Sequence, residues 1–330
     1  MNSASARWLF LWACVFSAGL SPGSLGAAPP ERKVAVTIDD LPAASADAMD
    51  GQAILDMTAK LLTALQEEKV PVVGFVNEKK LFKLGEVDQR IKALQMWVDA
   101  GFELGNHTFS HASLNRAGLK EEEDEVIRGE TVTRMLLEQK KMKLRYFRHP
   151  YLDTGRDLKT RRDFEAFLVE RGYTIAPITL DAWDWNFAGG YQRAQKHGDK
   201  ALEKEIVDTY FSYTNEVLAY SEKLSKQVVG YEPAQVLLLH ANSLEADHLH
   251  ELIKLIRKRG YRFIPLQEAL SDQAYSLPDE YVGEEGTGWL DHWAITQGKP
   301  PQDFPVFPQA VVDKARALDK GDAQAKDSDY

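Results

Sequence analysis

Seven short apolar runs, separated by longer stretches of helical periodicity, constrain the fold of this 330-residue chain more than any other feature. The runs are KVAVTID, VPVVGFVN, FELGNH, RYFRHPY, TIAPITLD, QVLLLH and YRFIPL. Between them, apolar residues recur at helical spacing, as Ile54, Leu61 and Leu65 do after the first run. Strands that alternate with helices indicate βαβ units and a parallel sheet. The pattern predicts an α/β fold, either a (β/α) barrel with one unit missing or an open doubly wound sheet.

The composition supports a folded core and excludes some classes of partner. Hydrophobic residues make up 44% of the chain and aromatic residues 10%, which is enough to fill a sizeable core. Asp and Glu outnumber Lys and Arg by 50 to 40, giving a net charge of -10. Because nucleic acids and anionic membrane surfaces attract basic proteins, we expect neither as a partner.

The first thirty residues have the features of a secretory signal peptide. MNSASARWLFLWACVFSAGLSPGSLGAAPP contains one arginine, an apolar stretch from Trp8 to Leu20, and small residues from Ser24 to Ala28. A membrane anchor is the alternative, but the apolar stretch is shorter than the roughly 20 residues that span a bilayer. We therefore predict a signal peptide over 1–28 and a periplasmic or secreted protein with no integral membrane segment after cleavage. The only cysteine, Cys14, lies inside this segment, so the mature protein would have no disulfide.

Downstream, we expect one domain over 29–275 and a C-terminal extension over 276–330. The domain contains a long connection of 49 residues, 186–234, with a helical stripe formed by Leu202, Ile206, Tyr210, Tyr213, Val217, Tyr220 and Leu224. We expect a long amphipathic helix there, preceded by a loop at Gly189 to Tyr191. Trp289 and Trp293 are four residues apart, which predicts a short helix docked on the body. The last residues, KGDAQAKDSDY, are typical of a solvated, disordered tail.

Polar residues that could bind a metal or move a proton stand at the ends of five of the predicted strands. They are Asp39 and Asp40, His107 and His111, Arg148, Asp181, and His240. Each has an ordinary alternative, such as a turn, a helix cap or a surface ion pair. Because the carboxyl ends of parallel strands form one face, however, all of them are predicted to converge. Their joint occurrence favours a functional site.

The two histidines of GFELGNHTFSHASL are four residues apart, so one helical turn could direct both imidazoles at a metal ion. The zinc-protease pattern requires a glutamate directly after the first histidine, and Thr108 occupies that position. A third ligand must come from elsewhere in the chain.

Five motifs, in this order, resemble those of the polysaccharide deacetylase family, the NodB-like domain of carbohydrate esterase family 4. They are TIDD at 37–40, HTFSH at 107–111, RHPY at 148–151, DAWDW at 181–185 and LLH at 238–240, within a similarity over about 33–270. The resemblance implies a distorted (β/α)7 barrel that removes acetyl groups with the help of a divalent metal.

The resemblance also implies a role for each motif residue. Asp40, His107 and His111 would bind the metal, with Asp39 as general base and His240 as general acid. Arg148 would pair with the base, and Asp181 would tune the catalytic histidine. The backbone amide of Tyr151 would face the oxyanion, Trp185 would form a wall of the pocket, and Leu238 would shape the acetyl site. Two imidazoles and one carboxylate leave coordination positions open, which favours one catalytic Zn²⁺ per chain.

These expectations predict an enzyme that removes acetyl groups from N-acetylated amino sugars of an extracytoplasmic polysaccharide, with peptidoglycan as the first candidate. The sequence leaves several alternatives open: a chitooligosaccharide or acetylxylan deacetylase, a deacylase of a lipid-linked sugar, and a non-catalytic glycan-binding module of the same fold.

Overall fold

A computed structural model describes residues 31–328 of the chain, with side chains described as far as residue 319. The predicted signal peptide, 1–28, lies outside the described residues. Over 31–328, no helix combines the length and the hydrophobicity needed to cross a membrane.

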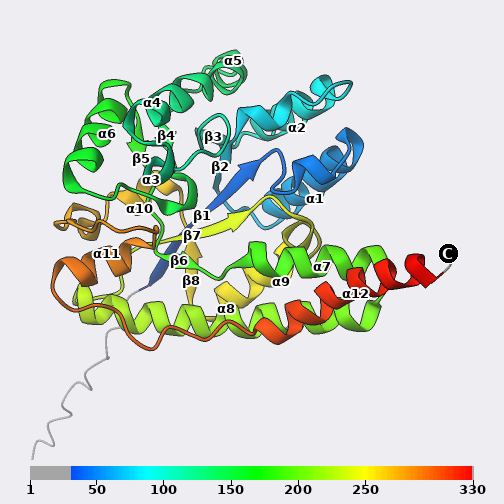
Figure 1. Ribbon diagram of the computed structural model, residues 1–330. Coiled ribbons are helices and arrows are strands. Elements are labelled where there is room, and N and C mark those ends of the chain that lie inside the picture. The colour runs from blue at the N-terminus through cyan, green and yellow to red at the C-terminus, as the bar shows by residue number, and fades with distance from the viewer. Residues whose placement is uncertain (1–30, 329–330) are drawn as a thin grey trace, which may run out of the picture. The chain divides into compact units, whose positions relative to one another are not determined.

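A parallel sheet forms the centre of the described part (Figure 1). Its strands are β1 (Arg32–Leu41), β2 (Val72–Val76), β3 (Glu103–Asn106), β4 (Tyr146–Phe147), β5 (Thr174–Ile175), β6 (Leu180–Asp181), β7 (Gln235–His240) and β8 (Tyr261–Phe263). Their order is β5-β4-β3-β2-β1-β7-β6, and β8 pairs with the first residues of β1. The predicted α/β fold with parallel strands is confirmed.

The run TIAPITLD, predicted as one strand, forms two short strands at opposite edges of the sheet. β5 pairs with β4, whereas β6 pairs with β7. Pro177 lies between them, and its missing N–H prevents the run from continuing as one paired strand. Because residues 174–181 contribute to both edges, the sheet is curled, as expected for a distorted (β/α)7 barrel.

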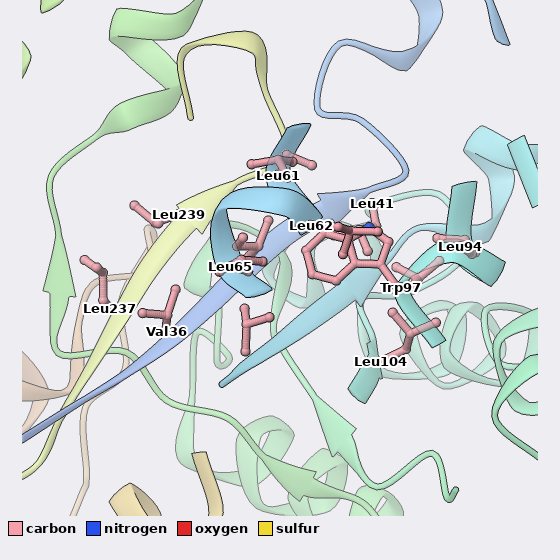
Figure 2. Close-up of a cluster of buried hydrophobic side chains, with 14 of the residues drawn as sticks. Val36, Leu41, Leu61, Leu62, Leu65, Leu94, Trp97, Leu104, Leu237 and Leu239 are labelled. Carbon is pink, nitrogen blue, oxygen red and sulfur yellow. The ribbon is translucent and has the colours of Figure 1, made fainter. Parts of the chain in front are cut away.

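Helices cover the outer face of the sheet and follow the predicted order. They are α1 (Gly51–Glu67), α2 (Val87–Asp99), α3 (Leu114–Ala117), α4 (Leu119–Arg128), α5 (Thr131–Gln139), α6 (Leu158–Glu170), α7 (Asp184–His197), α8 (Lys200–Val228), α9 (Ser243–Lys258), α10 (Leu266–Leu270), α11 (Trp289–Thr296) and α12 (Gln309–Ser328). Figure 2 shows Leu61 and Leu65 of α1 in the same cluster as Val36 of β1 and Leu239 of β7. Burying these side chains stabilises the fold by roughly 1.5–3 kcal/mol each.

Helices α7, α8 and α12 pack on one another beside the sheet (Figure 1). The long helix predicted from Leu202 onward is α8, and its stripe faces inward as expected. The loop predicted at Gly189 to Tyr191 is wrong, because these residues lie within α7. Gly190 is buried, and a Cβ there would be 3.6 Å from the Cβ of Ala315.

The C-terminal extension is more ordered than the sequence suggests. α11 confirms the predicted docked helix, since Trp289 and Trp293 are both buried. α12 continues to Ser328 and so overlaps the tail from residue 320, for which disorder stays a prediction. Val312 and Ala315 of this helix pack in one cluster with residues of α7 and α8, and that packing stabilises the first turns of α12.

Candidate active site

The strand ends place the predicted polar residues around one pocket, in which Asp39 and His240 are partners on neighbouring strands β1 and β7. Successive residues of a strand normally point to opposite faces, so Asp39 and Asp40 should diverge. Asp40 instead has a left-handed φ of 71°, which ends the alternation. Both carboxylates therefore line the pocket.

Asp40, His107 and His111 form the predicted metal-binding group. One ligand atom from each lies within 4.8 Å of the others, and His111 Nε2 is 3.7 Å from Asp40 Oδ1. The expectation that one helical turn aims the two histidines is corrected. Residues 107–111 form a loop in which Thr108 and His111 are left-handed, with φ of 63° at each.

The protonation of the two histidines fits a metal ligand. Burial lowers the pKa of His107 well below its usual value and lowers that of His111 to about 4, so both rings are neutral at physiological pH. His107 Nδ1 is 2.8 Å from the backbone carbonyl of Arg148, so it carries the proton and leaves the lone pair on Nε2. Two neutral imidazoles and a carboxylate are consistent with a divalent metal site.

Lys80, which sequence reasoning missed, contacts the third ligand. It belongs to a short 3-10 helix, η2 (Glu78–Leu81), and its Nζ donates to Asp40 Oδ1 at 2.8 Å. Burial alone would raise the pKa of Asp40, but neighbouring positive charge, chiefly that of Lys80, outweighs it and holds that pKa below its usual value. Asp40 is therefore ionised, as a metal ligand must be.

Asp39 and Arg148 form a buried pair in the interior of the barrel. Arg148 Nη1 is 3.3 Å from Asp39 Oδ2, and its other nitrogens donate to Thr37 Oγ1 and the carbonyl of Ala176. Burial raises the pKa of Asp39 to about 6 although Arg148 opposes that shift. Asp39 Oδ1 is buried with no hydrogen-bond partner. A carboxylate with one free oxygen beside the ligands can act as a base near neutral pH.

Asp184, and not Asp181, forms hydrogen bonds with His240, the predicted general acid. Asp184 Oδ1 is 2.8 Å from His240 Nδ1, and its other oxygen accepts from the backbone N–H of His240 and from Asn242 Nδ2. Burial would lower the pKa of His240, but this carboxylate and others nearby raise it to about 10. Asp181 instead accepts from the backbone N–H of Trp183 at 2.8 Å. Asp181 interacts with His240 through its charge, and its predicted tuning role stays a prediction.

The pocket has a volume of about 570 Å³, and the remaining predicted residues line it. Leu238 is buried, whereas Trp185 is 51% exposed at the rim. The ring of Tyr151 lies edge-on to His111 at 4.4 Å. Glu285 and Gly286, from the C-terminal extension, complete the wall. Sequence periodicity gave no signal for these two, because the loop reaches the pocket only through tertiary contacts.

Backbone strain is concentrated around this pocket. Of the nine non-glycine residues with left-handed φ in the described range, six lie here: Asp40, Thr108, His111, Tyr151, Leu152 and Trp183. Each such conformation costs on the order of 1–3 kcal/mol and persists only where its surroundings impose it. The site is therefore built by the fold at a local cost in stability.

Comparisons with known proteins agree with this geometry. Residues 26–165 match the polysaccharide deacetylase family. A peptidoglycan-N-acetylglucosamine deacetylase from Bacillus cereus is 23% identical over 241 residues, covering 72% of this chain and 67% of that protein.

Among solved structures, a mutant of a family 4 carbohydrate esterase pseudoenzyme, whose wild type is from Bacillus anthracis, is similar with a TM-score of 0.50 and 18% identity. The match covers 74% of this chain and 69% of that one. A family 4 carbohydrate esterase from Streptomyces lividans has a TM-score of 0.46 and 20% identity over 73% of this chain and 97% of that one.

Proposed function

Because the chain belongs to the polysaccharide deacetylase family, we propose that it is a metal-dependent hydrolase that removes acetyl groups from the N-acetylated amino sugars of an extracytoplasmic glycan. The observation that supports the proposal is the register of β1 with β7, which pairs Asp39 with His240 next to Asp40 of the metal-binding group. In this proposal Asp39 is the base and His240 is the acid.

Asp40, His107 and His111 would hold the ion, for which this donor set favours zinc. When bound, such an ion lowers the pKa of water and stabilises the negative charge that develops on the acetyl oxygen. The other residues of the pocket supply the proton transfers and the positioning.

Asp39 would take the proton from the attacking water through its unpaired oxygen, while Arg148 keeps the carboxylate oriented. His240, protonated because Asp184 raises its pKa to about 10, would give a proton to the leaving sugar amine. The amide of Tyr151 would face the developing oxyanion. Leu238 and Trp185 would enclose the acetyl group and the sugar.

The glycan and the location are part of the same proposal. The signal-like segment at 1–28 supports export to the periplasm or medium. The name of the Bacillus cereus relative supports peptidoglycan as a substrate, with chitooligosaccharides and acetylated xylan as the alternatives. A pseudoenzyme is among the similar structures, so a non-catalytic module is the alternative. The presence of Asp39, His240 and the metal-binding group at one pocket supports the catalytic proposal instead.

Acetate release from a panel of peptidoglycan, chitooligosaccharides and acetylated xylan tests the proposal directly. Zinc-loaded protein should release acetate from at least one member, and the Asp39→Asn variant should not do so at a comparable rate. If folded, zinc-loaded protein released acetate from none of them, the proposed function would be wrong.

A further inference from the structure

Lys80 contacts the metal-binding group, although the proposed proton transfers give it no part. Its Nζ donates to Asp40 Oδ1 at 2.8 Å and is 3.5 Å from the backbone carbonyl oxygen of the same residue. Over the described residues, Asp40 is the only acceptor of this ammonium. The side chain of Lys80 is only 19% exposed, so little water screens its charge. The positive charge is therefore directed at one metal ligand.

The lysine and a histidine ligand approach the same oxygen atom. His111 Nε2 is 3.7 Å from Asp40 Oδ1, the oxygen to which Lys80 donates. An ion bound by the metal-binding group must lie within bonding distance of the Asp40 carboxylate. Two cations, the ammonium and the metal, would then share one carboxylate.

The backbone of Lys80 is fixed close to this carboxylate by a buried arginine. Arg90 Nη1 donates to the carbonyl of Lys80 at 2.7 Å. Its Nη2 donates to the carbonyls of Ala46 and Met49, in the segment that follows β1, at 2.8 and 2.9 Å. Because Arg90 is buried, these bonds tie η2 firmly to the end of β1. The lysine can leave Asp40 only by rotation of its side chain.

The same short helix supports the loop that carries both histidine ligands. The backbone N–H of Lys79 donates to the carbonyl of Phe109 at 2.9 Å. Asn77 Nδ2, just before η2, donates to the carbonyl of His107. η2 and the histidine loop are therefore one hydrogen-bonded unit. A change of the side chain at position 80 leaves these contacts in place, since none of them involves it.

Lys80 influences the site through Asp40 and not through the substrate. Asp40, His107 and His111 line the catalytic pocket, whereas Lys80 is absent from the described residues that line it. The ammonium therefore lies behind the carboxylate as seen from the pocket.

A cation is an unusual outer partner for a metal ligand. Such a partner is commonly an acceptor that makes the ligand a stronger donor, as the carbonyl of Arg148 does for His107. The ammonium of Lys80 has the opposite effect on Asp40. It withdraws negative charge from the carboxylate, and it repels a divalent ion placed beside it.

We propose that Lys80 competes with the divalent ion for Asp40 and so lowers the metal affinity of the site. The ion then exchanges readily, and activity follows the concentration of free metal. This role rests on the proposed function, whose metal it regulates. Repulsion between charges so close together predicts a dissociation constant about tenfold or more above that of the same three ligands without the lysine.

The test measures the dissociation constant of the full chain for zinc, by competition with a chelating indicator after bound metal has been removed by dialysis. Lys80→Gln loses the charge but keeps a hydrogen-bond donor, and it should bind zinc about tenfold more tightly or better. Lys80→Arg keeps the charge and should bind zinc as the unmodified protein does. Lys79→Gln, at an exposed lysine of the same helix, is the matched control and should leave the affinity unchanged.

The variants separate the charge of Lys80 from a structural role. Tighter zinc binding by Lys80→Gln alone supports the proposal. An unchanged or weaker affinity, in a Lys80→Gln protein that unfolds at the same temperature as the unmodified one, would overturn it. If Lys80→Gln fails to fold, Lys80→Met, which also removes the charge, takes its place with the same two outcomes.

The test of the proposed function is independent of this one, because zinc affinity is measured without substrate. No acetate from any glycan, together with the expected order of affinities, would overturn the proposed function alone. Acetate release with equal affinities in all variants would overturn the role of Lys80 alone. In an active enzyme, acetate release by Lys80→Gln should saturate at a lower concentration of free zinc than acetate release by the unmodified protein.

Discussion

The two halves of the chain contribute to the active site in different ways. Residues 31–165, which fall within the match to the family, contribute the metal-binding group and Asp39, the proposed base, from strand ends and the loops that follow them. Residues 166–319 contribute His240, the proposed acid, and the walls built by α8 and the Gly286 segment. Apart from His240 and its partner Asp184, the second half mainly shapes the space around the polar groups of the first half.

This difference has a physical basis. A side chain at a strand end is positioned by the hydrogen bonds of the sheet, which leave it little freedom. A wall built by a helix and a loop is positioned by side-chain contacts such as those of Asn115 and Asp153, which can differ between related chains. Substitutions of the polar groups at the strand ends, His240 included, should abolish activity, and substitutions in the walls should modify it.

The largest effect is expected from the ligands. His107→Ala or His111→Ala should remove both the metal and the activity, because two ligands rarely hold a catalytic ion. Elemental analysis and acetate release measure the two losses. His250→Ala, at a surface ion pair with Glu68, is the control and should keep both. Stoichiometric zinc in either ligand variant would show that the ligand set is wrong.

Substitutions of the adjacent aspartates Asp39 and Asp40 should have separate effects on catalysis and on metal binding. Asp39→Asn should retain the metal and lose activity by about 10²-fold or more, because the general base is gone. Asp40→Asn should lose the metal as well, since Asp40 is the ligand that lies close to His111. Near-normal turnover of metal-loaded Asp39→Asn would contradict the role given to that carboxylate.

Substituting Asp181 and Asp184 separately tests the role of His240 as the general acid. His240 must be protonated to act, so activity should fall as the pH rises through its pKa, which Asp184 raises to about 10. In Asp184→Asn the imidazolium loses this partner, and the alkaline limb should move to lower pH by about one unit or more. Asp181→Asn, whose carboxylate bonds the Trp183 amide, should shift the limb less. The reverse order of shifts would return the tuning role to Asp181.

Substituting Gly286, which lines the pocket wall, should lower both the stability of the protein and its activity. Gly286→Ala places a Cβ 2.2 Å from backbone, so we expect a loss of about 1–3 kcal/mol and a several-fold fall in activity with the metal retained. Gly189→Ala on α7 is the control, because the only neighbour of its Cβ is an arginine nitrogen at 3.4 Å. Thermal unfolding and metal content measure both. An unchanged melting temperature for Gly286→Ala would mean that this wall is free to move.

The smallest effect is expected at the rim. Trp185 is 51% exposed, so Trp185→Ala should change the free energy of unfolding by no more than about 0.5 kcal/mol. KM for the glycan should rise several-fold while kcat changes little, if the indole binds the sugar. An unaltered KM on every substrate of the panel would remove Trp185 from the pocket wall that contacts substrate.

Much of the ligand set was predictable, because the signal is local. A polar residue that directly follows an apolar run marks the end of a strand, and parallel strands bring those ends together. Asp40, His107 and His111 were assigned in this way together with the family resemblance, and they lie within reach of one another. Lys80 could not be assigned, because it belongs to a short 3-10 helix with no periodicity and meets Asp40 only in the folded chain.

The sequence by itself determined the alternation of strands and helices, the aspartate and histidines of the metal-binding group, and the long helix α8. Each of these depends on neighbours along the chain. Only the tertiary structure decided that Asp184 holds His240, since the choice depends on where α7 begins. Trp183 takes a left-handed φ of 53°, the helix starts at the next residue, and the Asp184 carboxylate points inward to β7. Only the tertiary structure, likewise, brought α8, the Gly286 segment and Phe304 together around one cavity. Contacts between segments so far apart in sequence arise from packing, which no local pattern encodes.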